Sequence, residues 1–134
     1  MEKNTCYTYF AIKGDFNPDD ITLMLGLTPS KFWCIGDKGQ YGKDSYDFSL
    51  WEYGRCDTYD VETSNQMAVT ISDLKSKRLL LQEIKEKCDA VFTLEIVPCI
   101  YVGESAPSLA PSREIIEFCY LTGTEIDIDL YLYE

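Results

Sequence analysis

The sequence predicts an α+β fold with a mostly antiparallel five-stranded sheet and helices packed on one face. Strand-like alternation at both ends of the chain, helical spacing between them, and glycine or proline at most boundaries support this prediction. The 134 residues, of which 46% are hydrophobic and 26% charged, suit one globular domain spanning residues 1–134. The expected element order is β-α-β-β-α-α-β-α-β.

The first part of the chain predicts a strand followed directly by a short helix. Residues 5–14 alternate between two sets of side chains, and Gly14 closes this strand. Asn17 suits the N-cap of a helix, and Pro18 suits its first position because proline lacks an N–H group. Gly26 is a suitable residue to end this helix.

The middle of the chain predicts two strands and then two helices. We expect a short strand at 31–35, a turn-rich loop at 36–44 and a second strand at 46–55. Residues 61–88 have helical spacing, but the phase of the apolar positions breaks at 72–76. This break predicts two helices rather than one.

The last part of the chain predicts a strand, a helix and a final strand. Residues 90–101 are strand-like, although Pro98 restricts this strand to an edge or a bulge. Ser112 suits the N-cap of the last helix and Gly123 its end. Strict alternation over 125–133 predicts the final strand. It would place Ile126, Ile128, Leu130 and Leu132 inward and Asp127, Asp129, Tyr131 and Tyr133 outward.

The two ends of the chain share a strand, a glycine-containing loop and a helix that ends at glycine. This likeness suggests two related halves that share one sheet, as in a ferredoxin-like arrangement.

The lack of histidine is the compositional feature that constrains function most. It removes the commonest general base, the commonest metal ligand and any nucleophile paired with histidine. The net charge of −11 disfavours binding to nucleic acid or to an anionic membrane, whereas it suits either a basic protein partner or simple solubility. We expect no catalytic residue, metal site or cofactor.

The six cysteines predict a reducing compartment. None of them forms a Cys-x-x-Cys pair, and the N-terminal residues lack the pattern of a secretion signal. We therefore expect a cytoplasmic protein whose thiols are all free.

Two groups of residues are candidates for a binding surface. Trp33, Trp51 and Tyr53 lie in a region rich in glycine and aromatic residues and could line a groove for a peptide or a planar ligand. The alternative is that these aromatic side chains fill the core.

The second group is acidic and consists of Glu95, Asp127 and Asp129. These carboxylates are expected on one open face of the sheet, where paired acids can hold a cation or transfer protons. The alternative is an ordinary solvated face, since acidic residues on a terminal strand also discourage edge pairing.

Three segments resemble a family of small bacterial proteins known as domain of unknown function 4279. They are the stretch from Tyr9 to Asp19, the stretch from Ser49 to Gly54, and residues 114–118 with Gly123 and 126–129. The resemblance covers nearly the whole chain in order. It implies a bacterial α+β domain and provides no catalytic residue.

These observations favour a non-catalytic protein-binding module, such as an acidic inhibitor or immunity-type partner of a basic protein. Two alternatives stay open. One is a small-molecule or metal-dependent enzyme that uses the sheet-face carboxylates, and the other is a structural protein that forms a homodimer through an edge strand.

Overall fold

Two long antiparallel strands form the centre of the sheet in the computed structural model, which describes residues 2–39 and 44–134. The strand β1 (Thr5–Asp15) pairs along its whole length with β4 (Asp89–Tyr101). On the other side of β1 lies β3 (Ser49–Cys56), also antiparallel, and β2 (Lys31–Trp33) pairs with the outer side of β3. These pairings confirm a mostly antiparallel sheet.

The other edge of the sheet is parallel to its neighbour. Both β5 (Thr124–Ile128) and β6 (Tyr131–Tyr133) pair with β4 in the parallel sense, one after the other along its length. The strand order is therefore β2-β3-β1-β4-β5, with β6 continuing the β5 edge. The described residues form six strands rather than the five predicted, because the expected final strand breaks at Asp129 and Leu130.

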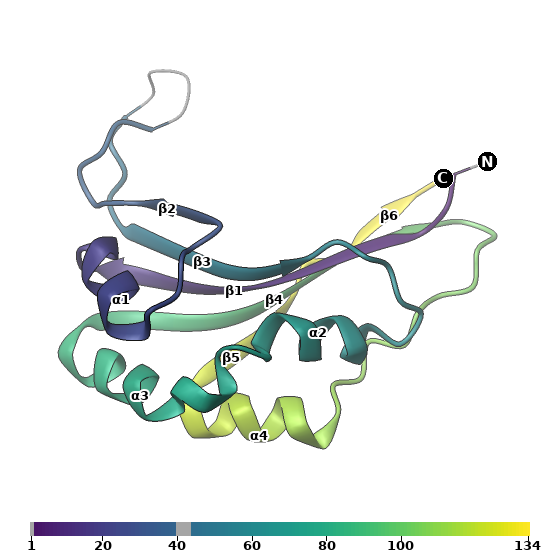
Figure 1. Cartoon of the computed structure of the whole chain (residues 1–134). Coiled ribbons are helices and arrows are strands. Elements are labelled where there is room, and N and C mark those ends of the chain that lie inside the picture. Colours follow the sequence, from purple (N-terminus) through teal and green to yellow (C-terminus); the bar gives the residue numbers. More distant parts are fainter. Residues whose placement is uncertain (1, 40–43) are drawn as a thin grey trace.

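The described α-helices all lie on one side of the curved sheet, as predicted (Figure 1). They are α1 (Pro18–Leu25), α2 (Thr63–Ile71), α3 (Arg78–Lys87) and α4 (Arg113–Thr122), with a short 3-10 turn, η2 (Lys75–Lys77), before α3. The Asn17 side chain accepts a hydrogen bond from the Asp19 amide at 3.0 Å, which confirms the predicted cap of α1. The turn at η2 explains the break in the helical pattern.

The core lies between the helices and one face of the sheet. Alternate residues of β1 and β4 enter it, and apolar residues from all four α-helices meet them there. Its largest fully buried side chains include Trp51, Phe10, Phe92, Ile12, Ile21, Met67, Leu81 and Ile84. None of the described helices lies on the opposite face of the sheet, as Figure 1 shows.

The final strand is less buried than its alternation predicted. Ile126, Ile128, Leu130 and Leu132 are 37%, 43%, 46% and 71% exposed, so the expectation that they are buried in the core is wrong, although Ile126 and Ile128 do point to the helix side. The strand lies at the sheet edge, and α4 contacts β5 without enclosing it. Alternation fixes which residues share a face, but it does not show whether another layer covers that face.

The ferredoxin-like arrangement of two halves in one sheet is present in the order β2-β3-β1-β4, where all neighbours are antiparallel. One half is β1-α1-β2 and the other runs from β3 through α2 and α3 to β4, and each half has a strand of the other between its own two strands. The halves are not the first and last segments of the chain, as predicted, because β1 and β2 run parallel with β3 between them, whereas β4 and β5 are parallel and directly paired. The two ends of the chain therefore build different units.

All six cysteines are unpaired in the structure, and three of them, Cys6, Cys56 and Cys119, are buried. Within the described ranges no helix is both long enough and apolar enough to cross a membrane. Part of the turn-rich loop predicted at 36–44, namely residues 40–43, lies outside the described residues.

Candidate functional site

The open face of the sheet brings Glu95 and Asp127 together. Residues that are directly opposite on adjacent strands point to the same face. Tyr9 of β1 is opposite Glu95 of β4, and Glu95 is opposite Asp127 of β5. Because the neighbours of these residues, Phe10 and Leu94, lie in the core, this row faces away from the helices. The structure thus supports the predicted shared face for Glu95 and Asp127.

Glu95 is buried although it lies on the open face. Only 7% of its surface is exposed, and its Oε2 atom is enclosed without a hydrogen-bond partner. Burial and, after it, the hydrogen bonding and negative charge of the adjacent Asp127 carboxyl together raise the pKa of Glu95 to about 7. The Lys13 ammonium opposes this shift, but it does not outweigh it. Near neutral pH the Glu95 carboxyl is therefore protonated in part of the molecules.

Two further groups on the same face were missed in the sequence. Glu52 is opposite Ala11 and is 7% exposed, and burial raises its pKa although Lys31 and Arg55 oppose the shift. The pKa of Tyr9 is raised to about 12 by burial and by the charges of Glu95 and Glu52. The sequence did contain a signal for Tyr9, because the alternation of residues 5–14 places Tyr9 on the face of the first strand opposite to that of Phe10.

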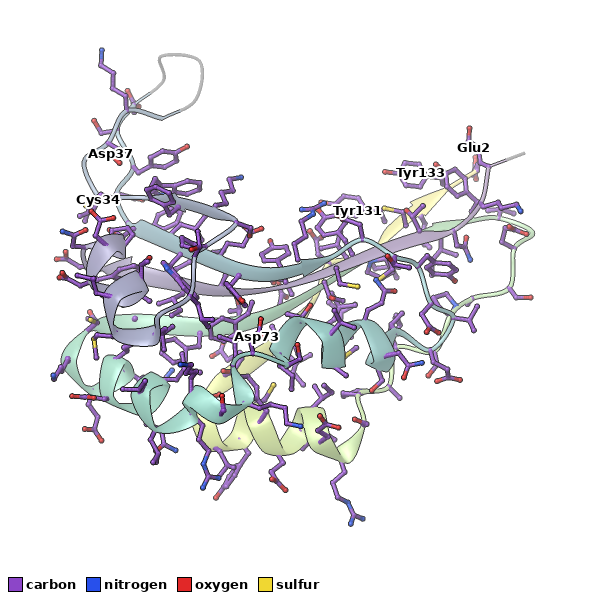
Figure 2. The ribbon with its side chains drawn as sticks, in the orientation of Figure 1. Glu2, Cys34, Asp37, Asp73, Tyr131 and Tyr133 are labelled. Atoms are coloured by element: carbon purple, nitrogen blue, oxygen red, sulfur yellow. The ribbon has the colours of Figure 1, made fainter. Side chains whose placement is uncertain are left out.

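Tyrosines cover the end of this face nearest the chain termini. Tyr131 and Tyr133 project from the side of the sheet opposite the helices (Figure 2). The Tyr133 ring stacks on Tyr101 at 5.0 Å between ring centres, and the Tyr131 hydroxyl donates a hydrogen bond to Asp129 at 3.0 Å. Asp129 is close enough to Glu95 for its charge to raise the pKa of that residue. Its side chain is exposed and already accepts the hydrogen bond from Tyr131.

The predicted aromatic group does not join this surface. Trp51 is fully buried and its indole N–H donates to the Thr22 hydroxyl at 3.1 Å, so it is a core residue. Tyr53 stacks on Trp51 and donates to Asp73 at 2.6 Å, and Figure 2 shows Asp73 on the helix side. Trp33 is the last residue of β2, at the opposite edge of the sheet, and its ring stacks on that of Tyr46. Three strands lie between β2 and β5.

The outer edge of β5 and β6 has backbone groups without a neighbouring strand. The Asp129 N–H donates to the Ile96 carbonyl, and the Tyr133 carbonyl accepts from the Val102 N–H, both at 2.9 Å. Since successive residues of a strand direct their backbone groups to opposite sides, those of Ile128 and Leu132 point away from β4. No other strand of the described chain pairs with this edge.

The geometry of the acidic pair suits a proton or an organic cation better than a metal ion. In residues 2–39 and 44–134 no three histidine, cysteine or acidic side chains are grouped so that they could hold a metal ion. Most metal sites need more ligands than two carboxylates supply. A guanidinium or ammonium group needs only acceptors, which the pair provides.

A groove on the helix side is a weaker candidate. Its volume is about 440 Å³ and it lies between the starts of α3 and α4. Lys75, Arg78 and Arg113 line it, but all three are exposed, two glutamates line it as well, and one of these, Glu114, pairs with Lys75 at 2.6 Å. Its charges are thus partly neutralised by neighbours.

A family model described as Domain of unknown function (DUF4279) matches residues 4–133. The chain belongs to the DUF4279 family. No curated protein and no solved structure matches this DUF4279 chain. The family match extends from the residue before β1 to the last residue of β6, so it includes the whole sheet and both parts of its exposed edge.

Proposed function

We propose that this DUF4279 domain is a non-catalytic protein-binding module of the bacterial cytoplasm that acts as an acidic partner of a basic protein. In this proposal an extended segment of the partner pairs with the outer edge of β5 and β6 as an additional strand. The single observation that carries the proposal is the exposed edge itself, where the residues with outward backbone groups, Ile128 and Leu132, also have exposed apolar side chains.

Within the described residues, the edge lacks lysine, proline and a covering element, and its only charged side chains are acidic, which discourages pairing with another acidic strand but not with a basic one. Proteins usually blunt such an edge with lysine, proline or a covering element. Neither β5 nor β6 contains lysine or proline, and on the helix side Ile126, Ile128 and Leu132 are each more than a third exposed. A strand added here would satisfy the outward backbone groups and cover these apolar side chains.

The charge of the edge favours a basic partner over a second copy of this chain. Glu125 and Asp127 lie on the open face of β5, and Asp129 follows directly. A second copy would add the same carboxylates opposite these, and like charges on neighbouring strands repel. A strand with arginine or lysine on that face and apolar residues on the other would complement both sides of the edge.

A labelled peptide of alternating valine and arginine tests this proposal by fluorescence anisotropy. The Ile128→Pro variant removes an outward N–H donor and leaves the ladder with β4 intact, since proline is tolerated where the N–H faces outward at an edge. Ile128→Thr is the matched control, because it also loses the isoleucine side chain but keeps the N–H group. We expect Ile128→Pro to weaken binding at least about tenfold relative to Ile128→Thr.

Three outcomes would contradict the proposal. The first is equal binding by the proline and threonine variants while both retain the wild-type circular dichroism spectrum. The second is no binding of the peptide to the wild-type protein. The third is a dimer in sedimentation experiments that Ile128→Pro dissociates, which would assign the edge to a second copy.

A further inference from the structure

Two enclosed side-chain oxygens without partners belong to residues that share the open face of β4. They are the hydroxyl oxygen of Thr93 and the Oε2 atom of Glu95, the two such atoms in the described part of the chain. Thr93 and Glu95 are two residues apart on one strand, so their side chains point to the same face. An enclosed polar atom without a partner costs about 1–3 kcal/mol, so this spot favours a donor from outside the chain.

The surroundings of these two oxygens are acidic. Asp127 lies opposite Glu95, and Asp129 and Glu52 add negative charge nearby. From β1, Tyr9 and Lys13 face the same region, and Lys13 is the one cation that shifts the pKa of Glu95. The site therefore provides acceptors and negative charge and has few donors of its own.

We propose that Thr93, Glu95 and Asp127 bind the guanidinium group of an arginine from the docked strand. This inference rests on the proposed function, because the docked strand brings the arginine to the site. A guanidinium has five N–H donors in a planar fork, so it can pair with a carboxylate through two bonds and still reach a hydroxyl. No group of the chain itself supplies that set of donors to Glu95 Oε2 and the Thr93 hydroxyl.

The spacing of the strands allows this contact. Neighbouring strands lie about 4.8 Å apart, so a strand added outside β5 lies about 10 Å from β4. A residue opposite Asp127 on the added strand points to the open face, directly beside that carboxylate. Only a long side chain such as arginine or lysine crosses β5 from there to reach Glu95.

Binding at this site is linked to the release of a proton. The pKa of Glu95 is about 7, so near neutral pH part of the protein carries a proton on this carboxyl group. A guanidinium pairs with the ionised carboxylates, and the proton must leave before the cation binds. Affinity therefore rises with pH, and a single group with this pKa gives about a tenfold increase from about pH 6 to pH 8.

The test compares the valine–arginine peptide with a peptide in which citrulline replaces each arginine. Citrulline keeps the shape of the side chain but has no charge. We expect the arginine peptide to bind about tenfold tighter at pH 8 than at pH 6, and the citrulline peptide to bind weakly at both. Glu95→Gln, which resembles the protonated acid, should weaken binding of the arginine peptide at pH 8 and remove its pH dependence. The control Glu86→Gln loses the same charge from an exposed position on α3 and should retain the pH dependence.

The outcomes separate this inference from the proposed function. If the arginine peptide binds equally at both pH values, or if Glu95→Gln keeps the wild-type pH dependence, the arginine site is wrong. Sensitivity of the same binding to Ile128→Pro would then still support strand addition. If neither peptide binds the wild-type protein at either pH, both the arginine site and the proposed function are wrong.

Discussion

Glu95 determines how the free protein should respond to pH. Its pKa is raised from an ordinary value of 4.5 to about 7 in the folded state, because burial and the Asp127 carboxylate disfavour its charge. The folded protein thus binds this proton more tightly than the unfolded chain does. The free energy of unfolding contributed by Glu95 is highest below about pH 4.5 and falls as pH rises through 7.

Substitution of Glu95 by glutamine should therefore stabilise the protein only at the higher pH. We expect Glu95→Gln to raise the free energy of unfolding at pH 8 by roughly 1–2 kcal/mol relative to wild type, an effect reduced by solvent at the sheet face. At pH 5 the two proteins should be nearly equal, because Glu95 is then protonated. Urea denaturation at the two pH values measures this difference. A variant that is less stable than wild type at pH 8 would show that the Glu95 charge stabilises the fold.

At the scale of single elements, the edge position of β5 determines how much each of its residues contributes to stability. Ile128 and Ile96 are opposite each other on β5 and β4, but Ile128 is 43% exposed whereas Ile96 is fully buried. Ile96→Ala should cost about 2–5 kcal/mol, as large-to-small changes in a core do. Ile128→Ala should cost less than about 1 kcal/mol. Thermal and urea denaturation of both variants test this, and a similar cost at both positions would mean that β5 is enclosed.

Local sequence signals predicted most of the helices and strands but not which strands pair with one another. Asn17 and Pro18 identified the start of α1 because caps and first-turn residues act within a few positions. The parallel pairing of β4 with β5 and the antiparallel pairing of β1 with β4 join distant segments, which alternation does not encode.

Only part of the candidate site was predictable from the sequence, because the site also depends on contacts between distant segments. The alternation of residues 125–133 placed Asp127 opposite the apolar positions, and the structure confirms that it shares a face with Glu95. The sequence did not distinguish whether the aromatic residues form a surface or a core. Trp51 entered the core because β3 lies beneath α1, a contact between segments about thirty residues apart. Glu52 was missed because nothing near it in sequence shows that it is buried.

At the scale of the whole molecule, the apolar core and the proposed binding edge lie in different parts of the fold. The helices cover one face of the sheet and bury the apolar core there. In the described part of the chain the other face carries no helix, and it presents Glu95 and Asp127 together with Tyr131 and Tyr133, the last two visible in Figure 2. With a net charge of −11, the molecule should attract a basic partner over a long range, and salt should weaken that attraction.

Amide hydrogen exchange at the edge tests the central claim, strand addition, most directly. The N–H groups of Ile128 and Leu132 point away from β4, so in the free protein they should exchange rapidly, whereas that of Asp129, bonded to Ile96, should be protected. At a saturating concentration of the valine–arginine peptide, we predict that the amides of Ile128 and Leu132 exchange at least about tenfold more slowly. The amide of Phe32, in β2 at the opposite edge of the sheet, should exchange at an unchanged rate. Unchanged exchange at Ile128 and Leu132 while the peptide is bound would contradict strand addition at this edge.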